Sequence, residues 1–392
     1  MGSTDGTEGA AARPVSLERA LEQVRSQPGF GRIGRVLVAM SGGIDSSVAA
    51  ALLTRSGLEV VGVSMRLFEK ANEAAGLDSE GRCCSLEDFQ DARRVAQEFG
   101  FSHFVLDFED RFAQEVIAPF KLAYLNGLTP NPCINCNKSL KFDTLIERAR
   151  TLSATHVATG HYARIQAGPE GYSLLRGRDP GKDQSYFLYH LNQNNMDKVL
   201  FPLGDYTKPE IRELARQLGL HLSEKAESQE ICFITEGRYD RFLLEEGAVE
   251  GDRPGVIRHL DGSQLGIHQG FWKFTIGQRK GIGVAAVDPL YVIRVDPDTN
   301  TVWVGGAADL DCRSLAATEV NWCRRVPEAP LVCEAKIRSR SEPAEALVIP
   351  TGEHGAQVTF MEPQRAVAPG QAVVFYREEE VLGGGWITTD RH

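Results

Sequence analysis

Short apolar runs alternate with helical periodicity over the first half of the chain. The runs at residues 36–39, 58–65, 104–106 and 155–159 are typical of buried strands. An Ala/Leu-rich helix is expected at about 46–53. Ser85 and Asp88 make a capping box for a second helix, whose stripe is Leu86, Phe89, Ala92, Ala96 and Phe99 and which ends at Gly100. This alternation predicts an α/β fold with a doubly wound parallel sheet.

The pattern changes after about Cys232, where Gly and Pro become frequent and helical periodicity fades. Short strands are expected at 291–295, 301–304, 332–337, 346–349, 357–360 and 372–376, separated by turns. These predict a small central domain followed by a C-terminal β-barrel. We place the first domain at 34–234, the central linker domain at 235–307 and the barrel at 308–392. Residues 1–33 are expected to form a disordered, solvated extension.

Composition narrows the class of protein. A length of 392 residues suggests two or three domains. The chain has no apolar run long enough to span a membrane and no signal peptide, so we expect a cytoplasmic protein without a membrane partner. Its eight cysteines are then reduced and available for chemistry or metal binding. A net charge of −10 argues against a uniformly basic nucleic-acid coat but leaves room for a local basic surface.

Residues 41–46, with the sequence Ser-Gly-Gly-Ile-Asp-Ser, follow the first strand and open the first helix. Two glycines let backbone N–H groups approach a phosphate, and the helix N-terminus adds a partial positive charge. The hydroxyls of Ser41, Ser46 and Ser47 can donate to phosphate oxygens, while Asp45 can orient Mg²⁺ or the loop itself. An ordinary polar turn is the simpler alternative. The combination of strand, full motif and helix favours a nucleotide site.

Three cysteines stand out. Cys133 and Cys136 form a Cys-x-x-Cys pair after the turn-rich residues 129–132, and Cys232 follows 96 positions after Cys136. A helix beginning after Cys136 would favour its thiolate. On the residues alone three interpretations stay open. Cys136 and Cys232 are reactive thiols, or Cys133, Cys136 and Cys232 hold a metal or an iron–sulfur cluster, or Cys232 is a buried small hydrophobe.

Seven short strings appear in order along the chain. They lie at 41–46, 83–88, 129–142, 158–164, 182–188, 227–233 and 275–281. Together they resemble the tRNA-specific 2-thiouridylases of the PP-loop ATP pyrophosphatase superfamily, over about residues 35–380. The resemblance implies an adenine nucleotide α-hydrolase-like first domain. It also implies an ATP site made of Ala39, Met40, Ser41, Gly42, Gly43, Ile44, Asp45, Ser46, Met65 and Gly160.

The resemblance also implies a reaction. ATP, with Mg²⁺, adenylates O2 of the wobble uridine of tRNA and pyrophosphate leaves. Sulfur then displaces AMP to give 2-thiouridine. By position, Cys232 resembles the family's persulfide carrier and Cys136 its nucleophilic partner, and the two could close a disulfide after transfer. The sulfur would come from a cysteine desulfurase, directly or through a sulfur-relay protein.

Contacts with tRNA are implied for a further set of residues. They are Asn131, Pro132, Cys133, His161, Lys182, Asp183, Gln184, Arg338, Ser339 and Gln371. Many family members carry Asp, a proposed acid/base, where this chain has Cys133. The change raises the odds of a 4Fe–4S cluster on Cys133, Cys136 and Cys232. Ser339 replaces an aromatic residue, so a stacking contact with RNA is expected to be absent.

Two other functions compete with the thiouridylase. A PP-loop amidotransferase or ligase uses the same loop but needs no paired thiols. A non-catalytic tRNA-binding protein needs neither Ser41 and Asp45 nor both thiols. The combination of phosphate loop and cysteines in one chain favours the sulfur-transfer enzyme over both.

Overall fold

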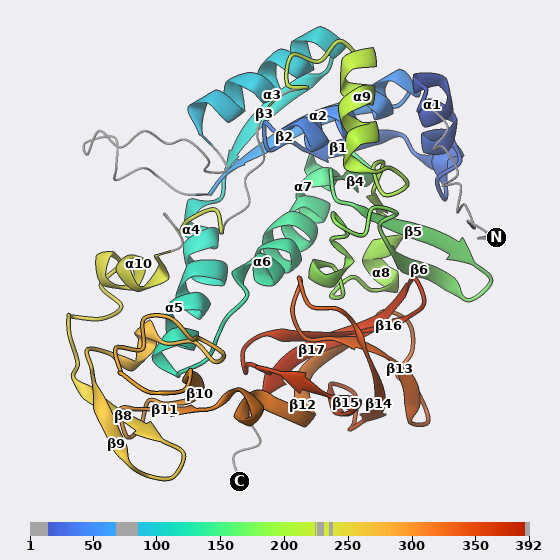
Figure 1. Cartoon of the computed structure of the whole chain (residues 1–392). Helices are drawn as coiled ribbons and strands as arrows, with labels where there is room; N and C mark the ends of the chain where they lie inside the picture. The colour runs from blue at the N-terminus through green and yellow to red at the C-terminus, as the bar shows by residue number, and fades with distance from the viewer. Residues whose placement is uncertain (1–14, 68–84, 224, 226–230, 235–237, 389–392) are drawn as a thin grey trace, which may run out of the picture.

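The computed structural model describes residues 15–67, 85–223, 225, 231–234 and 238–388. Its first domain is built on five parallel strands in the order β3-β2-β1-β4-β7 (Figure 1). Alternate residues of β1 enter different cores, Val36 and Val38 on one face and Leu37 on the other. The predicted doubly wound parallel sheet is therefore confirmed. The strands are β1 (Arg35–Ala39), β2 (Glu59–Arg66), β3 (Ser102–Asp107), β4 (His156–Ala158) and β7 (Val199–Leu200).

Helices cover both faces of this sheet. One face is covered by α1 (Leu17–Arg25), α2 (Ile44–Arg55), α3 (Leu86–Phe99) and α9 (Lys208–Gln217). The other carries two helical runs, each with a π-helical part. The first is α4 (Glu109–Phe112), η3 (Ala113–Ile117) and α5 (Ala118–Leu125). The second is α6 (Pro132–Asn135), η4 (Cys136–Thr144) and α7 (Leu145–Thr151). None of the helices in the described ranges is long and apolar enough to cross a membrane.

Two expectations about helices need correction. The expected disordered extension is helical in part, because α1 buries Ala20 and Val24 against the sheet domain. Residues 1–14 of that extension lie outside the described residues. In α3 the capping box of Ser85 and Asp88 forms as predicted, but Leu86 is 62% exposed and Val95 takes its place in the core. Leu86 is the first residue of the helix, and the buried positions begin only at Ala92.

The central domain is a mixed four-stranded sheet in the order β10-β11-β8-β9. Its strands are β8 (Gly255–His259), β9 (Gln264–His268), β10 (Tyr291–Asp296) and β11 (Thr301–Gly305). The helices nearby are α10 (Tyr239–Glu245), η6 (Phe271–Lys273) and η7 (Ala307–Leu310). Phe271 and Val292 share one core with Phe120 of α5, so the central domain packs against the first domain.

Six C-terminal strands close into the predicted barrel, in the order β12-β15-β14-β13-β16-β17, because β12 also pairs with β17. They are β12 (Asp311–Trp322), β13 (Leu331–Lys336), β14 (Ala344–Pro350), β15 (Gly355–Arg365), β16 (Ala372–Arg377) and β17 (Glu380–Thr388). The hairpin of β5 (Ala163–Gly168) and β6 (Gly171–Arg176) comes from the first domain and joins β17. Two short helical elements follow it, η5 (Ser185–Phe187) and α8 (Gln193–Met196). The barrel is thereby joined to the first domain.

Candidate active site

The predicted phosphate loop lies between β1 and α2, and α2 begins at Ile44, two residues earlier than expected. Gly42 has a φ of +72°, and a Cβ at this position would lie 2.3 Å from the carbonyl oxygen of Asp88. A Cβ on Gly160 would lie 2.8 Å from the amide nitrogen of Ser46. Both glycines are therefore required by close approach of the backbone, which leaves the first turn of α2 open to a ligand.

The serine hydroxyls of the loop divide into two kinds. Ser41 and Ser46 line the cavity in front of the loop, and the Ser46 hydroxyl accepts from the Ser41 amide at 3.1 Å. Ser47 is buried, and its hydroxyl donates to the Gly43 carbonyl at 2.9 Å. The Ser46 hydroxyl also donates to the Gly43 carbonyl, at 3.1 Å, but of these two serines only Ser46 lines the cavity, so the phosphate contact expected of Ser47 is not available to it.

Asp45 is held from two sides. The buried Lys208 ammonium contacts both of its carboxylate oxygens, at 2.8 and 2.9 Å. The Tyr162 hydroxyl donates to one of them at 2.8 Å. Of the two roles considered for Asp45, this geometry favours orientation of the loop. Lys208 was missed in the sequence because it lies 163 positions from its partner and no local motif links them.

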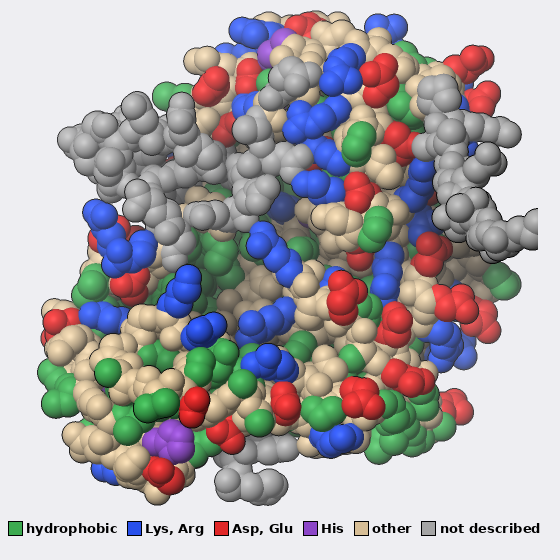
Figure 2. All heavy atoms as spheres, in the orientation of Figure 1, with side chains coloured by type: hydrophobic (Ala, Val, Ile, Leu, Met, Phe, Trp, Pro, Cys, Tyr) green, Lys and Arg blue, Asp and Glu red, His purple; other side chains and the backbone are tan. Residues whose placement is uncertain are grey.

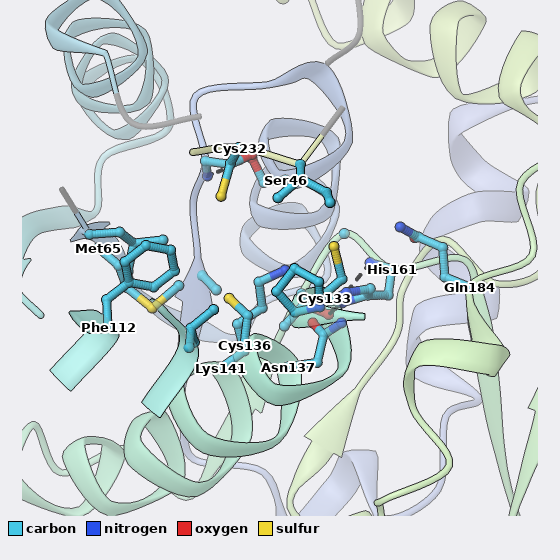
Figure 3. Close-up of a pocket in the computed structure, with 18 of the residues that line it drawn as sticks. Ser46, Met65, Phe112, Cys133, Cys136, Asn137, Lys141, His161, Gln184 and Cys232 are labelled. Carbon is cyan, nitrogen blue, oxygen red and sulfur yellow. Dashed lines mark hydrogen bonds between the residues drawn. The ribbon is translucent and has the colours of Figure 1, made fainter. Parts of the chain in front are cut away.

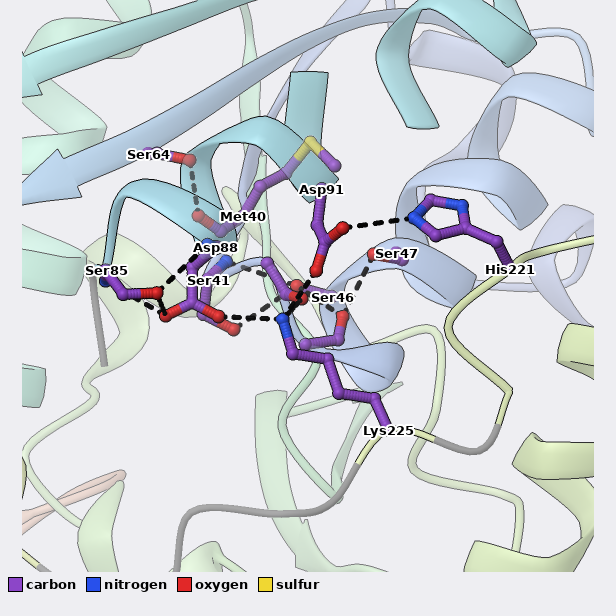
Figure 4. A network of polar contacts seen from close by, with 12 residues as sticks. Met40, Ser41, Ser46, Ser47, Ser64, Ser85, Asp88, Asp91, His221 and Lys225 are labelled. Carbon is purple, nitrogen blue, oxygen red and sulfur yellow. Dashed lines mark hydrogen bonds and ion pairs between the residues drawn. The ribbon is translucent and has the colours of Figure 1, made fainter. Parts of the chain in front are cut away.

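A second lysine braces the loop (Figure 4). The Lys225 ammonium donates to the Gly42 carbonyl at 3.1 Å, to Asp88 at 2.9 Å and to Asp91 at 2.6 Å. Burial lowers the pKa of Lys225, but its hydrogen bonds to Asp91 and Asp88 outweigh burial and raise that pKa above its ordinary value. Lys225 therefore stays charged at neutral pH. It ties the Gly-rich turn to the N-terminal part of α3.

The loop opens into a cavity of about 300 Å³. Helix run α6–η4 faces the loop across it, and residues 231–233 form a further wall (Figure 3). The cavity brings together these predicted site residues: Ala39, Met40, Ser41, Asp45, Ser46, Met65, Pro132, Cys133, Cys136, Gly160, His161, Gln184 and Cys232. Lys141 and Asn137 also line it and were not singled out from the sequence.

All three candidate cysteines face this cavity from two directions. Cys133 and Cys136 lie in the first turns of the helical run that begins at Pro132, whereas Cys232 comes from the opposite wall. Within the described residues, no group of three or more Cys, His, Asp or Glu side chains is placed to hold a metal ion. Cys83 and Cys84 lie outside the described residues. The arrangement suits separate thiols better than a shared metal.

His161 lines the cavity as a neutral side chain. Its Nδ1 lies 2.7 Å from the Thr159 hydroxyl, and the ring is buried beside Phe142 at 6.0 Å between centroids. Burial first, and then the positive charge of Lys141, hold the pKa of His161 well below its usual value. The imidazole therefore offers hydrogen bonding without charge at neutral pH.

Profiles of known families match the chain in succession. Residues 34–236 match a tRNA methyl transferase HUP domain, 241–306 a tRNA methyl transferase PRC-barrel domain and 312–387 an aminomethyltransferase β-barrel domain. Curated relatives named tRNA-specific 2-thiouridylase MnmA match nearly the whole chain. That of Geobacter metallireducens is 48% identical over 358 residues, 90% of this chain and 96% of the relative. That of Carboxydothermus hydrogenoformans is 47% identical over 361 residues, 91% and 98% of the two chains. The chain belongs to the tRNA-specific 2-thiouridylase family.

A solved structure offers a weaker likeness to this thiouridylase-family chain. A 4-thiouridine synthetase–RNA complex with bound ATP is 20% identical and covers 57% of this chain and 51% of its own, with a TM-score of 0.33. That score is too low to carry an argument. The family membership rests on the curated relatives and on the profile that spans the first domain.

The remaining site residues expected from the thiouridylase family are not among those that line the cavity. They are Gly42, Gly43, Ile44, Asn131, Lys182, Asp183, Arg338, Ser339 and Gln371. Several have structural contacts of their own. The Asp183 carboxylate accepts from Gly177 and Ser185, and the Gln371 amide donates to the Thr129 carbonyl at 2.9 Å. Arg338 donates to the Ala366 carbonyl at 2.8 Å.

Proposed function

We propose that this chain catalyses the ATP-dependent 2-thiolation of the wobble uridine of tRNA, giving 2-thiouridine, AMP and pyrophosphate. The observation that carries the proposal is the shared cavity. A phosphate loop and two cysteines from opposite walls face one space, so an activated base and a sulfur atom can meet there. We further propose the domain boundaries 34–234, 235–307 and 308–392, with the catalytic residues in the first domain.

The first step is activation of uridine O2, an otherwise poor leaving group. The N–H groups of the loop and the N-terminus of α2 would hold the phosphates of ATP, and Ser41 and Ser46 would donate to them. O2 attacks the α-phosphate, pyrophosphate leaves, and the uridine is adenylated. A Mg²⁺ ion would come with the ATP phosphates, since both oxygens of Asp45 are already engaged by Lys208.

The second step is sulfur transfer. We assign Cys232 as the carrier of a persulfide and Cys136 as its partner. The Cys136 thiolate attacks the inner sulfur of the persulfide, and the released sulfide displaces AMP at C2 of the base. A Cys136–Cys232 disulfide remains, and an external thiol must reduce it before the next cycle. The sulfur would be delivered by a cysteine desulfurase or by a relay protein.

The tRNA contacts are proposed for residues at and around the mouth of the cavity. Figure 2 shows Lys and Arg side chains along the middle of one face, between the α/β domain and the two β-domains. Such charges supply the phosphate contacts that dominate tRNA affinity. The proposed set is Asn131, Pro132, Cys133, His161, Lys182, Asp183, Gln184, Arg338, Ser339 and Gln371.

A cluster on Cys133, Cys136 and Cys232 does not fit the described geometry, since these side chains are not grouped as metal ligands. We therefore derive no step through iron. Anaerobic purification, iron and sulfide analysis, and a tRNA thiolation assay of the same sample test this directly. We expect ATP-dependent 2-thiouridine and AMP from iron-free protein, and no product from Cys136→Ser or Cys232→Ser. Activity that rises only with stoichiometric iron would overturn the persulfide route.

A further inference from the structure

Asn137 is a buried amide whose carbonyl has no partner. It lies one residue after Cys136 and lines the same cavity (Figure 3). Its side chain is only 4% exposed, and its Oδ1 makes no hydrogen bond to any described residue. Buried amide oxygens are nearly always paired in native proteins, because an unpaired one loses its hydration without compensation. The cavity therefore contains a polar group that awaits a ligand.

Lys141 stands beside Asn137 on the same wall. It follows Asn137 by four positions in the helical run and also lines the cavity. Residues four apart share a helical face. A lysine ammonium has three donors and no acceptor, whereas an amide has one acceptor and two donors. Together they present one acceptor next to several donors, which is the pattern that a complementary ligand must match.

Uracil has such a complementary edge. N3–H is a donor, and it is flanked by the acceptors O2 and O4. We propose that Asn137 recognises the target uracil, accepting from N3–H through Oδ1 and donating to O4 through Nδ2, with Lys141 as a second donor to O4. The proposal rests on the function proposed above. Pairing on the N3–O4 side leaves O2 unoccupied, so the reacting oxygen is free to face the phosphate loop.

The same pair of residues rejects cytosine. Cytosine carries an acceptor at N3 and an amino donor at N4, the reverse of uracil. The Asn137 amide can reverse by turning about its last torsion, but Lys141 cannot accept a hydrogen bond. An N4 amino group would therefore face an ammonium with no acceptor between them. Because Lys141 can only donate, the Asn137 amide must present its carbonyl to position 3 of the base and its NH2 group to position 4.

The test compares Asn137→Ala with Asn135→Ala in the full-length enzyme. Asn135 lies on the same helical run but does not line the cavity, which makes it a matched control. We expect Asn137→Ala to lower kcat/KM for thiolation about 10–100-fold, as for loss of a buried hydrogen-bond pair. Affinity for tRNA, set mainly by phosphate contacts, should stay within about twofold. Asn135→Ala should match the wild type in both.

A second substrate separates recognition from structure. In tRNA with 4-thiouridine at the target position, the acceptor at position 4 is weakened. The wild type should then lose activity several-fold, and Asn137→Ala should lose less, because only the Lys141 contact with position 4 remains. An equal penalty in both enzymes, or Asn137→Ala as active as Asn135→Ala, would overturn the proposal. Wild-type enzyme that makes no 2-thiouridine from normal tRNA would instead refute the proposed function.

Discussion

At the scale of single residues, the phosphate loop depends on the lack of a side chain at Gly42. This residue combines a left-handed φ with direct contact against the backbone of Asp88, so any Cβ meets both backbone strain and a clash. Gly57 has a φ of +95° but nothing within 4 Å of its would-be Cβ. An alanine at position 57 would therefore carry the free-energy cost of backbone strain alone, whereas an alanine at position 42 would carry that cost and the cost of a steric clash.

We predict that Gly57→Ala lowers the free energy of unfolding by about 1–2 kcal/mol, the cost of a left-handed alanine. Gly42→Ala should cost about 3 kcal/mol or more and also weaken ATP binding, because the loop must move away from α3. Urea denaturation and a nucleotide titration measure the two effects. Equal destabilisation by both variants would show that the Asp88 backbone can move away from a Cβ at position 42 without a cost in free energy.

His190 is one of the buried histidines that link stability to pH. Burial, helped by the charge of Lys138, lowers its pKa to about 3, against a smaller raising effect of a hydrogen bond to the Phe187 backbone. The folded state favours neutral His190. Its contribution to the free energy of unfolding is therefore complete above pH 6.5, the pKa of this side chain in the unfolded chain. That contribution is lost as the pH falls from about 6.5 toward 3.

We expect the free energy of unfolding to fall by up to about 1.4 kcal/mol per pH unit below 6.5 on account of His190. His190→Phe, which keeps a planar ring, should make this slope shallower. His354→Gln, at a side chain that is 71% exposed, should leave it unchanged. Denaturant titrations between pH 4 and 7 decide the matter, and an unaltered slope in His190→Phe would contradict the prediction.

At the scale of elements, the segment between α5 and α6 is tied to the barrel. Gln371, next to the start of β16, donates to the Thr129 carbonyl at 2.9 Å, and the Thr129 amide donates to the Pro369 carbonyl at 2.8 Å. This segment leads directly into Cys133 and Cys136. The barrel thus helps to set where the helical run carrying the cysteines begins.

We predict that Gln371→Ala lowers kcat for thiolation about 3–30-fold, as expected for loss of one hydrogen bond that positions a reacting group. The melting temperature should barely change. Gln364→Ala is the control, since that amide donates to the nearby carbonyls of Glu362 and Pro363. If Gln371→Ala instead weakens tRNA binding alone, the RNA contact proposed for Gln371 would account for its role, and the positioning of this segment would not.

At the scale of the whole molecule, an acidic protein is proposed to bind a polyanion. The net charge of −10 repels tRNA at long range, so binding must come from a local surface such as the Lys and Arg side chains seen in Figure 2. Each lysine that meets a phosphate releases a counterion. The salt dependence of tRNA affinity therefore counts the phosphate contacts.

Lys182→Ala should lower tRNA affinity and reduce the slope of log affinity against log salt by about 1. Lys198→Ala should leave that slope unchanged, because Lys198 is paired with Asp197 and lies outside the proposed tRNA set. Filter binding over a range of salt concentrations gives both values. Identical slopes for Lys182→Ala and the wild type would remove Lys182 from the interface.

Local patterns were enough to predict strands β1 to β4, helix α3 and the strand–loop–helix unit at residues 36–53. They also predicted the capping box at Ser85 and the six short strands expected after residue 290. These features depend on neighbours a few positions apart. Strands β12 and β17 were missed, and β17 contains Gly383, Gly384 and Gly385, which give no apolar alternation. The pairs β5–β6 and β8–β9 were missed too.

The sequence by itself determined the phosphate loop, the Cys-x-x-Cys pair and the family, because each is carried by contiguous residues. Only the tertiary structure decided what surrounds them. It brought Lys208 to Asp45 and Lys225 to Gly42, and it turned Asn137 and Lys141 into the cavity that Cys232 faces. Partners more than a hundred positions apart are selected by how helices pack on the sheet and by how the barrel closes. No periodicity within a short window records that choice.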